Sequence, residues 1–273
     1  MDKIKIVNAD YFSSIAAMVH HSIYNKSEYQ PEQAIQIDSV CSHASILNVK
    51  SLLYSQGYCV VESDLPVHNR LSFYQQYLTT LFGKPISGKN TACQGYTKVQ
   101  AVENAKFYFN SNLAQPMHTD EGHATTFPRY AALICEKEAV HGGDSIIVTL
   151  KLLYSALIQL FGNDIDLLFA KDAITIQNYQ GVKKKPVLIY VDNGDIGITY
   201  SPLLRKMWCS RLVFEMFDCI TQFIHTMDNQ TRFKLRSGQV LIFDNCKIIH
   251  GRTSFLSNDA RLLYRYWFQQ VNV

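Results

Sequence analysis

The sequence lacks a long apolar stretch, a signal peptide and an excess of either charge. None of its 273 residues falls in an apolar run of about 18 residues, so no membrane span is predicted. The opening stretch MDKIKIVNADYFSSIAAMVHH has neither a signal-peptide core nor a small-residue cleavage site. Lys plus Arg number 26 and Asp plus Glu 23, a net charge of +3, which gives no support for nucleic-acid binding. The three lysines at 183–185 are expected to form the solvated edge of a hairpin.

The cysteines show no pattern typical of a disulfide framework or a cysteine-rich zinc site. There are seven, an odd number, and no pair has C-x-x-C spacing. This excludes the common structural zinc sites and favours reduced, mostly buried thiols. We therefore expect a cytoplasmic protein with no membrane or nucleic-acid partner.

The composition that is present is that of a globular domain with a large core. Hydrophobic residues make up 47%, and 16 Tyr and 15 Phe are available to fill the interior. We expect one domain over 1–273, in which 1–46 form an irregular cover and 47–273 the core.

Periodicity predicts more strands than helices. Helices are expected at 47–57, 67–85 and 207–228, with one or two more over 151–172; the helix at 207–228 is expected to be the longest. Single strands are expected at 58–63, 105–110, 115–120, 129–138, 142–150, 247–251 and 261–270. Hairpins are expected at 185–201, turning at Asn193-Gly194, and at 232–245, turning at Ser237-Gly238. The mixture indicates a mainly β fold with flanking helices, a β-sandwich or jelly roll.

The stretch QPMHTDEGH, residues 115–123, holds two histidines and two carboxylates. Successive side chains of a strand point to opposite faces, so His118 and Asp120 can project to one side. Glu121 then falls on the other face, and His123, beyond Gly122, cannot be placed by this rule. One imidazole and one carboxylate are therefore available together. Taken alone, a His-x-Asp pair is common and a loop histidine is the simpler interpretation.

A third ligand is available from DNCKIIHGRTSF, where His250 ends an apolar β-like stretch. Two histidines and one carboxylate on one face of an octahedral ion suit non-haem Fe(II), with three positions left open. Arg261 and Arg265, four residues apart on the last strand, share a face. Inward-pointing arginines are costly unless they meet anions, and a guanidinium pairs well with a carboxylate. A buried structural histidine and arginines exposed on an edge strand remain the alternatives.

The motifs HTD, GGDS, FDN…HGRTSF and RLLYR, in this order, resemble the taurine dioxygenase (TauD/TfdA) family, which is similar to the γ-butyrobetaine hydroxylases. The resemblance runs from about residue 47 to the carboxyl terminus. It implies a double-stranded β-helix, a jelly-roll variant, and an Fe(II)- and 2-oxoglutarate-dependent dioxygenase that releases succinate and CO2.

The same resemblance implies roles for individual residues. It implies iron ligation by His118, Asp120 and His250, and a pairing of Arg261 with the distal carboxylate of 2-oxoglutarate. Ser145, in GGDS, stands where the family commonly has a threonine that contacts this carboxylate.

Two further residues are candidates for binding the primary substrate. Arg265 matches a position that binds an anionic substrate group in some relatives, and Glu121 follows the ligands in a loop near the iron. Arg252, in HGR, is expected to support His250. The substrate is expected to be a small polar or zwitterionic molecule such as an amino acid, betaine or sulfonate, oxidised with O2.

Three other functions are compatible with these residues. One is a catalytically silent jelly roll that binds a ligand. Another is a zinc or manganese enzyme on a cupin-like barrel. The third is desaturation or ring formation at the same iron centre.

Overall fold

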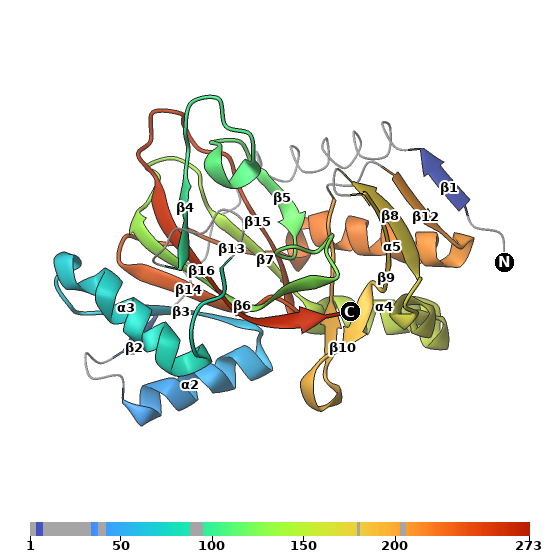
Figure 1. Cartoon of the computed structure of the whole chain (residues 1–273), viewed down its shortest axis with the longest axis horizontal. Helices are drawn as coiled ribbons and strands as arrows, with labels where there is room; N and C mark the ends of the chain where they lie inside the picture. Colours follow the sequence, from blue (N-terminus) through green and yellow to red (C-terminus); the bar gives the residue numbers. More distant parts are fainter. Residues whose placement is uncertain (1–3, 8–33, 38–41, 88–94, 179–180, 203–205) are drawn as a thin grey trace.

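The computed structural model describes residues 4–7, 34–37, 42–87, 95–178, 181–202 and 206–273, and its main feature is two sheets packed face to face (Figure 1). The six-stranded sheet has the order β2 (Ile35–Ile37), β3 (Tyr58–Ser63), β14 (Gln239–Asp244), β6 (Thr126–Lys137), β16 (Leu262–Asn272) and β4 (Tyr96–Gln100). The four-stranded sheet has the order β13 (Thr231–Phe233), β7 (Ser145–Thr149), β15 (Ile248–Arg252) and β5 (Gln115–His118). Except for the parallel pair β2 and β3, neighbours in both sheets are antiparallel.

The strand β16 shows how alternation divides the core. Its odd-numbered residues Leu263 and Trp267 pack into the cluster between the two sheets, where they join Ile147 and Ile248 of the four-stranded sheet. Its even-numbered residues Tyr264, Tyr266 and Phe268 pack into the cluster on the outer face of the six-stranded sheet. Because the side-chain period of a strand is two, one strand contributes to both layers.

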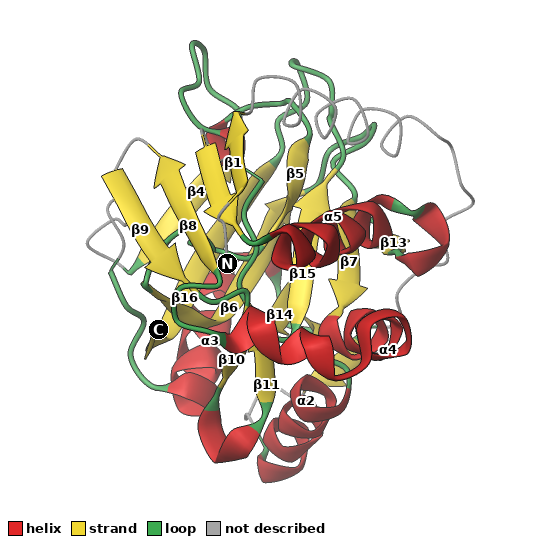
Figure 2. Ribbon diagram, turned by 90° about the vertical axis from the view of Figure 1, so that its right-hand side faces the viewer, coloured by secondary structure: helices red, strands yellow, loops and turns green. Residues whose placement is uncertain are grey.

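Helices cover the outer face of each sheet. The helices α2 (His43–Ser55) and α3 (Val67–Phe82) contribute Leu53, Tyr74 and Leu78 to the cluster on the six-stranded sheet. The helices α4 (Leu150–Phe161) and α5 (Arg211–His225) pack on the four-stranded sheet, and Figure 2 shows α5 crossing in front of β7 and β15. The result is a mainly β protein with helices outside both sheets.

The helical segment Leu150–Phe169 is long and apolar enough, by length and composition alone, to cross a membrane. Its residues Leu153, Leu157 and Leu168 are fully buried in the cluster beneath α4 and α5. These apolar side chains therefore stabilise the packing of the helix on the four-stranded sheet.

Two smaller sheets complete the structure. One has the order β1 (Ile4–Val7), β12 (Lys206–Cys209), β8 (Ile174–Asn178) and β9 (Gly181–Lys185). The other is the hairpin of β10 (Leu188–Tyr190) and β11 (Ile196–Ile198), which confirms the predicted hairpin. The described residues also include the 3₁₀ helices η1 (Tyr108–Asn110), η2 (Gly162–Phe169), η3 (Asp192–Gly194) and η4 (Met227–Asn229).

Two predicted elements differ from the structure. Residues 105–110 do not form a strand, because Asn110 accepts a hydrogen bond from the backbone N–H of Phe107 and closes the 3₁₀ turn η1. Residues 207–209 belong to the strand β12; the helix α5 begins after Ser210, which caps it by accepting from the N–H of Val213. At 15 residues, α5 is also shorter than the 16-residue α3.

Residues 232–245 do not form a hairpin. The strand β13 pairs with β7 in the four-stranded sheet, whereas β14 pairs with β3 and β6 in the six-stranded sheet. Phe233 of β13 and Leu241 of β14 meet in the cluster between the sheets. The chain therefore crosses from one sheet to the other at the turn that the sequence indicated.

The prediction of a solvated lysine edge is wrong for one of its three residues. The strand β9 is an edge strand, but Lys185 is 1% exposed and donates a hydrogen bond to the backbone oxygen of Gly122. Burial, with a smaller effect of Lys183, lowers the pKa of Lys185 to about 7.

The cysteines that the structure describes agree with the predicted reduced thiols. Cys59, Cys135, Cys209, Cys219 and Cys246 lie outside any disulfide, and all except Cys219 are buried. Most of residues 1–46, the predicted irregular cover, lie outside the described residues.

Candidate metal centre

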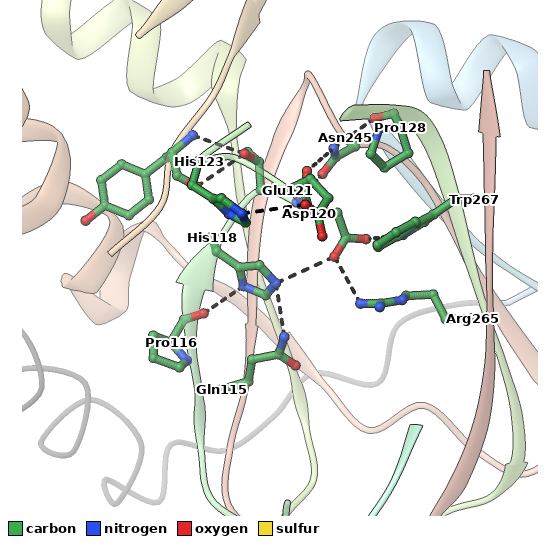
Figure 3. Close-up of polar contacts among 12 residues, drawn as sticks. Gln115, Pro116, His118, Asp120, Glu121, His123, Pro128, Asn245, Arg265 and Trp267 are labelled. Carbon is green, nitrogen blue, oxygen red and sulfur yellow. Dashed lines mark hydrogen bonds and ion pairs between the residues drawn. The ribbon is translucent and has the colours of Figure 1, made fainter. Parts of the chain in front are cut away.

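His118 ends the edge strand β5, with one ring nitrogen fixed by the backbone. Its Nδ1 lies 2.8 Å from the backbone oxygen of Pro116, so an Nδ1–H donates there and Nε2 keeps its lone pair. This Nε2 lies 3.7 Å from Oδ1 of Asp120 (Figure 3). The nitrogen directed at the carboxylate is therefore the one available to a metal.

Asp120 is 2% exposed, and its carboxylate is bound on both sides. Arg265 donates from Nη1 to Oδ1 at 3.2 Å, and Trp267 donates from Nε1 to Oδ2 at 2.7 Å. Burial by itself would raise the pKa of Asp120, but Arg265 and the two imidazoles hold this pKa well below its ordinary value. The side chain is therefore an anion at neutral pH.

His250 comes to this carboxylate through strand pairing. It lies opposite His118 across β15 and β5, and the two ring centroids are 4.3 Å apart. Burial, followed by the neighbouring His118, lowers the pKa of His250 to about 3, so the ring is neutral. Its Nδ1 is buried and has no hydrogen-bond partner among the described residues.

The three side chains predicted from the sequence are thus brought together. One ligand atom from each of His118, Asp120 and His250 lies within 4.8 Å of the other two. The neutral ring of His250 and the ionised carboxylate of Asp120 are in the protonation states that a divalent cation requires. The donor set therefore fits iron, which prefers two histidines and one carboxylate with open positions beside them.

A pocket lined by arginines adjoins the three ligands. It is lined by Gln115, Ser145, His250, Arg252, Arg261 and Arg265, together with apolar residues. Arg261 is 5% exposed, and its Nη1 has no hydrogen-bond partner among the described residues. Burial lowers the pKa of Arg261 to about 10, which still leaves it a cation at neutral pH. A buried guanidinium nitrogen without a hydrogen-bond partner is costly, so the pocket favours an anion.

Ser145 lies in the same pocket, opposite Arg252 in the pairing of β7 with β15. Arg252 was expected to support His250 through an ion pair, but it forms no ion pair with any residue that the structure describes. It donates instead to the backbone oxygens of Ser111, at 3.0 Å, and Leu113. Its guanidinium therefore anchors the loop before β5, a role that sequence spacing could not indicate.

The loop after the ligands carries Glu121 and His123. Their side chains lie 3.6 Å apart at Oε2 and Nε2, and Glu121 has a left-handed backbone with φ of 54°. A Cβ at Gly122 would lie 2.3 Å from the backbone oxygen of Tyr200, so only glycine fits there. The loop is therefore held in one path directly after Asp120.

Sequence reasoning missed three residues that contact the ligands. Trp267 binds Asp120 as described, and Gln115 places its Nε2 3.0 Å from Nε2 of His118. Asn245 holds the backbone of Asp120 on both sides, accepting from its N–H at 2.7 Å and donating to its oxygen at 3.0 Å. Trp267 lies two residues after Arg265 on β16, so both side chains point to the same face of that strand. This spacing was the one feature of the sequence that could have indicated Trp267.

Comparison with solved structures shows the same fold in several oxygenases. An asparagine oxygenase in complex with Fe(II), hydroxyasparagine and succinate matches with a TM-score of 0.64 at 15% identity, over 96% of this chain and 92% of that chain. The non-haem iron oxygenase OrfP, in complex with Fe and α-ketoglutaric acid, matches with a TM-score of 0.64 at 15% identity, over 96% and 93%. A putative α-ketoglutarate-dependent taurine dioxygenase from Burkholderia xenovorans matches with a TM-score of 0.65 at 17% identity, over 90% and 97%.

No curated protein sequence matches the chain. Residues 27–267 do match a family described as taurine catabolism dioxygenase TauD, TfdA family. The match covers most of the chain and includes all three candidate ligands and the pocket arginines. The chain therefore belongs to the TauD/TfdA family of Fe(II)- and 2-oxoglutarate-dependent dioxygenases.

Proposed function

We propose that the protein hydroxylates an unactivated C–H bond of a small polar or zwitterionic molecule, with an amino acid as the first candidate. The convergence of His118, Asp120 and His250 beside a pocket that contains an unpartnered arginine carries this proposal. Bound iron and 2-oxoglutarate supply the oxidising chemistry, which consumes O2 and releases succinate and CO2. The protein positions the target carbon and excludes water.

The three ligands hold the iron in this proposal. Nε2 of His118 is directed by the Pro116 oxygen, and Asp120 is held as an anion by Arg265. His250 is kept neutral by its surroundings. The two hydrogen bonds of the Asn245 side chain to the backbone of Asp120 fix the position of the carboxylate. Fixed ligand positions reduce the reorganisation that metal binding requires.

Arg261 and Ser145 would bind the distal carboxylate of 2-oxoglutarate. Arg261 offers a buried guanidinium nitrogen that has no partner among the described residues, and Ser145 offers a hydroxyl in the same pocket. A charge-assisted pair at this depth is strong because little water competes with it. The cosubstrate would thereby be oriented with its other end towards the three ligands.

The primary substrate would meet both signs of charge. Arg265 lines the pocket as a cation, although one of its nitrogens is already bound to Asp120. Glu121 would bind a cationic group of the substrate from the loop after the ligands. An anionic and a cationic contact together favour a zwitterion. The solved asparagine oxygenase and OrfP contain hydroxylated asparagine and hydroxylated arginine, which supports an amino acid here.

The two facing sheets support a double-stranded β-helix, the jelly-roll fold expected for the family. The single domain over 1–273, the cytoplasmic location and the relation to γ-butyrobetaine hydroxylase stay predictions.

Anaerobic titration with Fe(II) and 2-oxoglutarate tests the proposal. A weak visible charge-transfer band is expected for the wild type and for His141→Ala, a control at an exposed histidine. His118→Ala and Asp120→Ala should abolish the band and the release of succinate. Amino acids, betaines and sulfonates are then compared for stimulated succinate release. Absence of the band in the wild type, or succinate release that persists in both ligand variants, would contradict the proposal.

A further inference from the structure

The two oxygens of the Asp120 carboxylate have different surroundings. Oδ1 lies 3.7 Å from Nε2 of His118 and accepts from Arg265 at 3.2 Å. Oδ2 accepts the indole N–H of Trp267 at 2.7 Å (Figure 3). The oxygen near the His118 imidazole and the oxygen held by the indole are therefore not equivalent.

Trp267 is itself held in place by its neighbours. It lies opposite Ala131 in the pairing of β16 with β6, and its ring packs into the cluster between the sheets. The guanidinium of Arg265 lies 4.3 Å from the centroid of the Trp267 ring and 5.5 Å from that of Phe109. Arg265 and Trp267 therefore form one stacked unit that offers a separate donor to each oxygen of Asp120.

The backbone of Asp120 is fixed independently of this unit. Asn245 accepts from the N–H of Asp120 and donates to its oxygen, and Asn245 also donates to the backbone oxygen of Pro128 at 2.9 Å. With the backbone fixed, turning the carboxylate would break the 2.7 Å bond to Trp267. A hydrogen bond to a buried charged group contributes about 1.5–3 kcal/mol, enough to favour one orientation.

The orientation of the carboxylate determines how many coordination positions of the metal remain open. An octahedral ion bound by two imidazoles and one carboxylate oxygen keeps three open positions, two for a chelating cosubstrate and one for O2. If both carboxylate oxygens bound, the cosubstrate would fill the two positions left, and O2 would have none. This reasoning depends on the proposed function, since it assumes iron and 2-oxoglutarate at this site.

We propose that Trp267 is a positioning residue whose indole N–H holds Oδ2 of Asp120, so that the carboxylate offers a single oxygen to the metal and the position for O2 stays open. The chain's own contacts assign this role, because the donor lies on the oxygen remote from His118. Trp267 does not need to touch cosubstrate or substrate to perform it.

The sharpest test replaces Trp267 with β-(3-benzothienyl)alanine, which has the shape of tryptophan but carries sulfur in place of the indole N–H. Trp267→Phe is a second variant that keeps an aromatic ring beside Arg265. Trp208→Phe, at the tryptophan of β12 in a different sheet, is the matched control. Each protein is loaded anaerobically with Fe(II) and 2-oxoglutarate, and the charge-transfer band confirms loading. Nitric oxide, a stable substitute for O2, is then titrated and its binding followed by electron paramagnetic resonance.

The wild type and Trp208→Phe are expected to bind nitric oxide alike. Both Trp267 variants should keep the charge-transfer band but bind nitric oxide at least about tenfold more weakly, within the range found when residues behind metal ligands are changed. Unchanged nitric oxide affinity in a loaded Trp267 variant overturns the proposal. Complete loss of iron from a folded variant also overturns it, because Trp267 would then hold the ligand set together. A wild type that never shows the band contradicts the proposed function instead.

Discussion

Replacing Arg261 with methionine is expected to change stability and cosubstrate affinity in opposite directions. Arg261 is 5% exposed, and its Nη1 has no hydrogen-bond partner among the described residues. The ring of Phe255 lies 5.5 Å from its guanidinium carbon, so much of the surroundings is apolar. In the absence of an anion the guanidinium therefore destabilises the fold, whereas a methionine of similar length would pack there without a charge.

The size of the stability effect follows from the pKa. Burial lowers the pKa of Arg261 from its ordinary value to about 10, and each pKa unit corresponds to about 1.4 kcal/mol. The folded-state penalty is thus about 3 kcal/mol. At neutral pH the side chain is charged in both the folded and the unfolded state, so the whole penalty applies. The penalty lessens only as pH rises above about 10 towards the ordinary pKa of an arginine. Metal-free Arg261→Met should therefore unfold with a free energy up to about 3 kcal/mol higher than that of the wild type.

The affinity for 2-oxoglutarate should fall in the same variant. Removing one partner of a buried, hydrogen-bonded charge pair costs about 2–5 kcal/mol. At about 1.4 kcal/mol for each tenfold change, the dissociation constant should rise by roughly 30-fold to several thousand-fold.

Denaturant unfolding of the metal-free proteins measures the first effect, and anaerobic titration of the charge-transfer band measures the second. Arg236→Met is the control, since the Arg236 side chain is 64% exposed and forms a surface pair with Glu138. It should change neither quantity appreciably. The reasoning is contradicted if Arg261→Met is less stable than the wild type and its dissociation constant for 2-oxoglutarate lies within about threefold of the wild-type value.

Three further changes test the packing around the site. Lys185→Met should raise the free energy of unfolding by about 5 kcal/mol at pH 6 and only about 1 kcal/mol at pH 9.5, because the buried amine has a pKa of about 7 and its charge penalty is lost as pH rises towards 10.5. Urea unfolding measures this gain, and a gain that does not depend on pH would disagree. Gly122→Ala should lower the free energy of unfolding by about 1–3 kcal/mol and weaken the binding of Co(II), a spectroscopic substitute for Fe(II), because its Cβ would lie 2.3 Å from the backbone oxygen of Tyr200. Thermal unfolding measures the stability and absorption titration measures the metal affinity. An unchanged variant would show that the loop can move to accept the methyl group. Asp244→Ala should lower the free energy of unfolding by about 3–5 kcal/mol, because Arg129, which lies 2.8 Å from Asp244 in the wild type, would become an unpaired buried cation. The double variant with Arg129→Met and Asp244→Leu should lose less stability. Equal losses in the two proteins would show that the unpaired charge is not responsible.

Local regularities in the sequence were enough to predict much of the fold. The apolar period of residues 67–82 predicts the helix α3, and the Asn193-Gly194 turn between apolar runs predicts the hairpin of β10 and β11. Both depend on interactions between residues that are close in the chain. The failure at 207–209 is also local, since Ser210 is a common helix cap that the helical period obscured.

The sequence also provided the ligands and the principal arginine. The period of two of a strand suggested that His118 pairs with Asp120 and Arg261 with Arg265. In the structure β5 ends at His118 and β16 begins at Leu262, so Asp120 and Arg261 lie just outside the strands. The structure confirms that His118, Asp120 and His250 converge and that both arginines line the adjoining pocket.

Only the tertiary structure decided which partners these side chains meet. No sequence pattern near β13 and β14 predicts that they pair with different sheets, because burial across the core determines which strands become partners. Nothing local indicates that Arg265 and Trp267 bind Asp120, since about 145 residues separate them in the chain. The sequence determined which chemical groups were available, through short-range periodicity and residue type. The packing of the two sheets determined their distances and charges, because those depend on contacts between segments that are far apart in the chain.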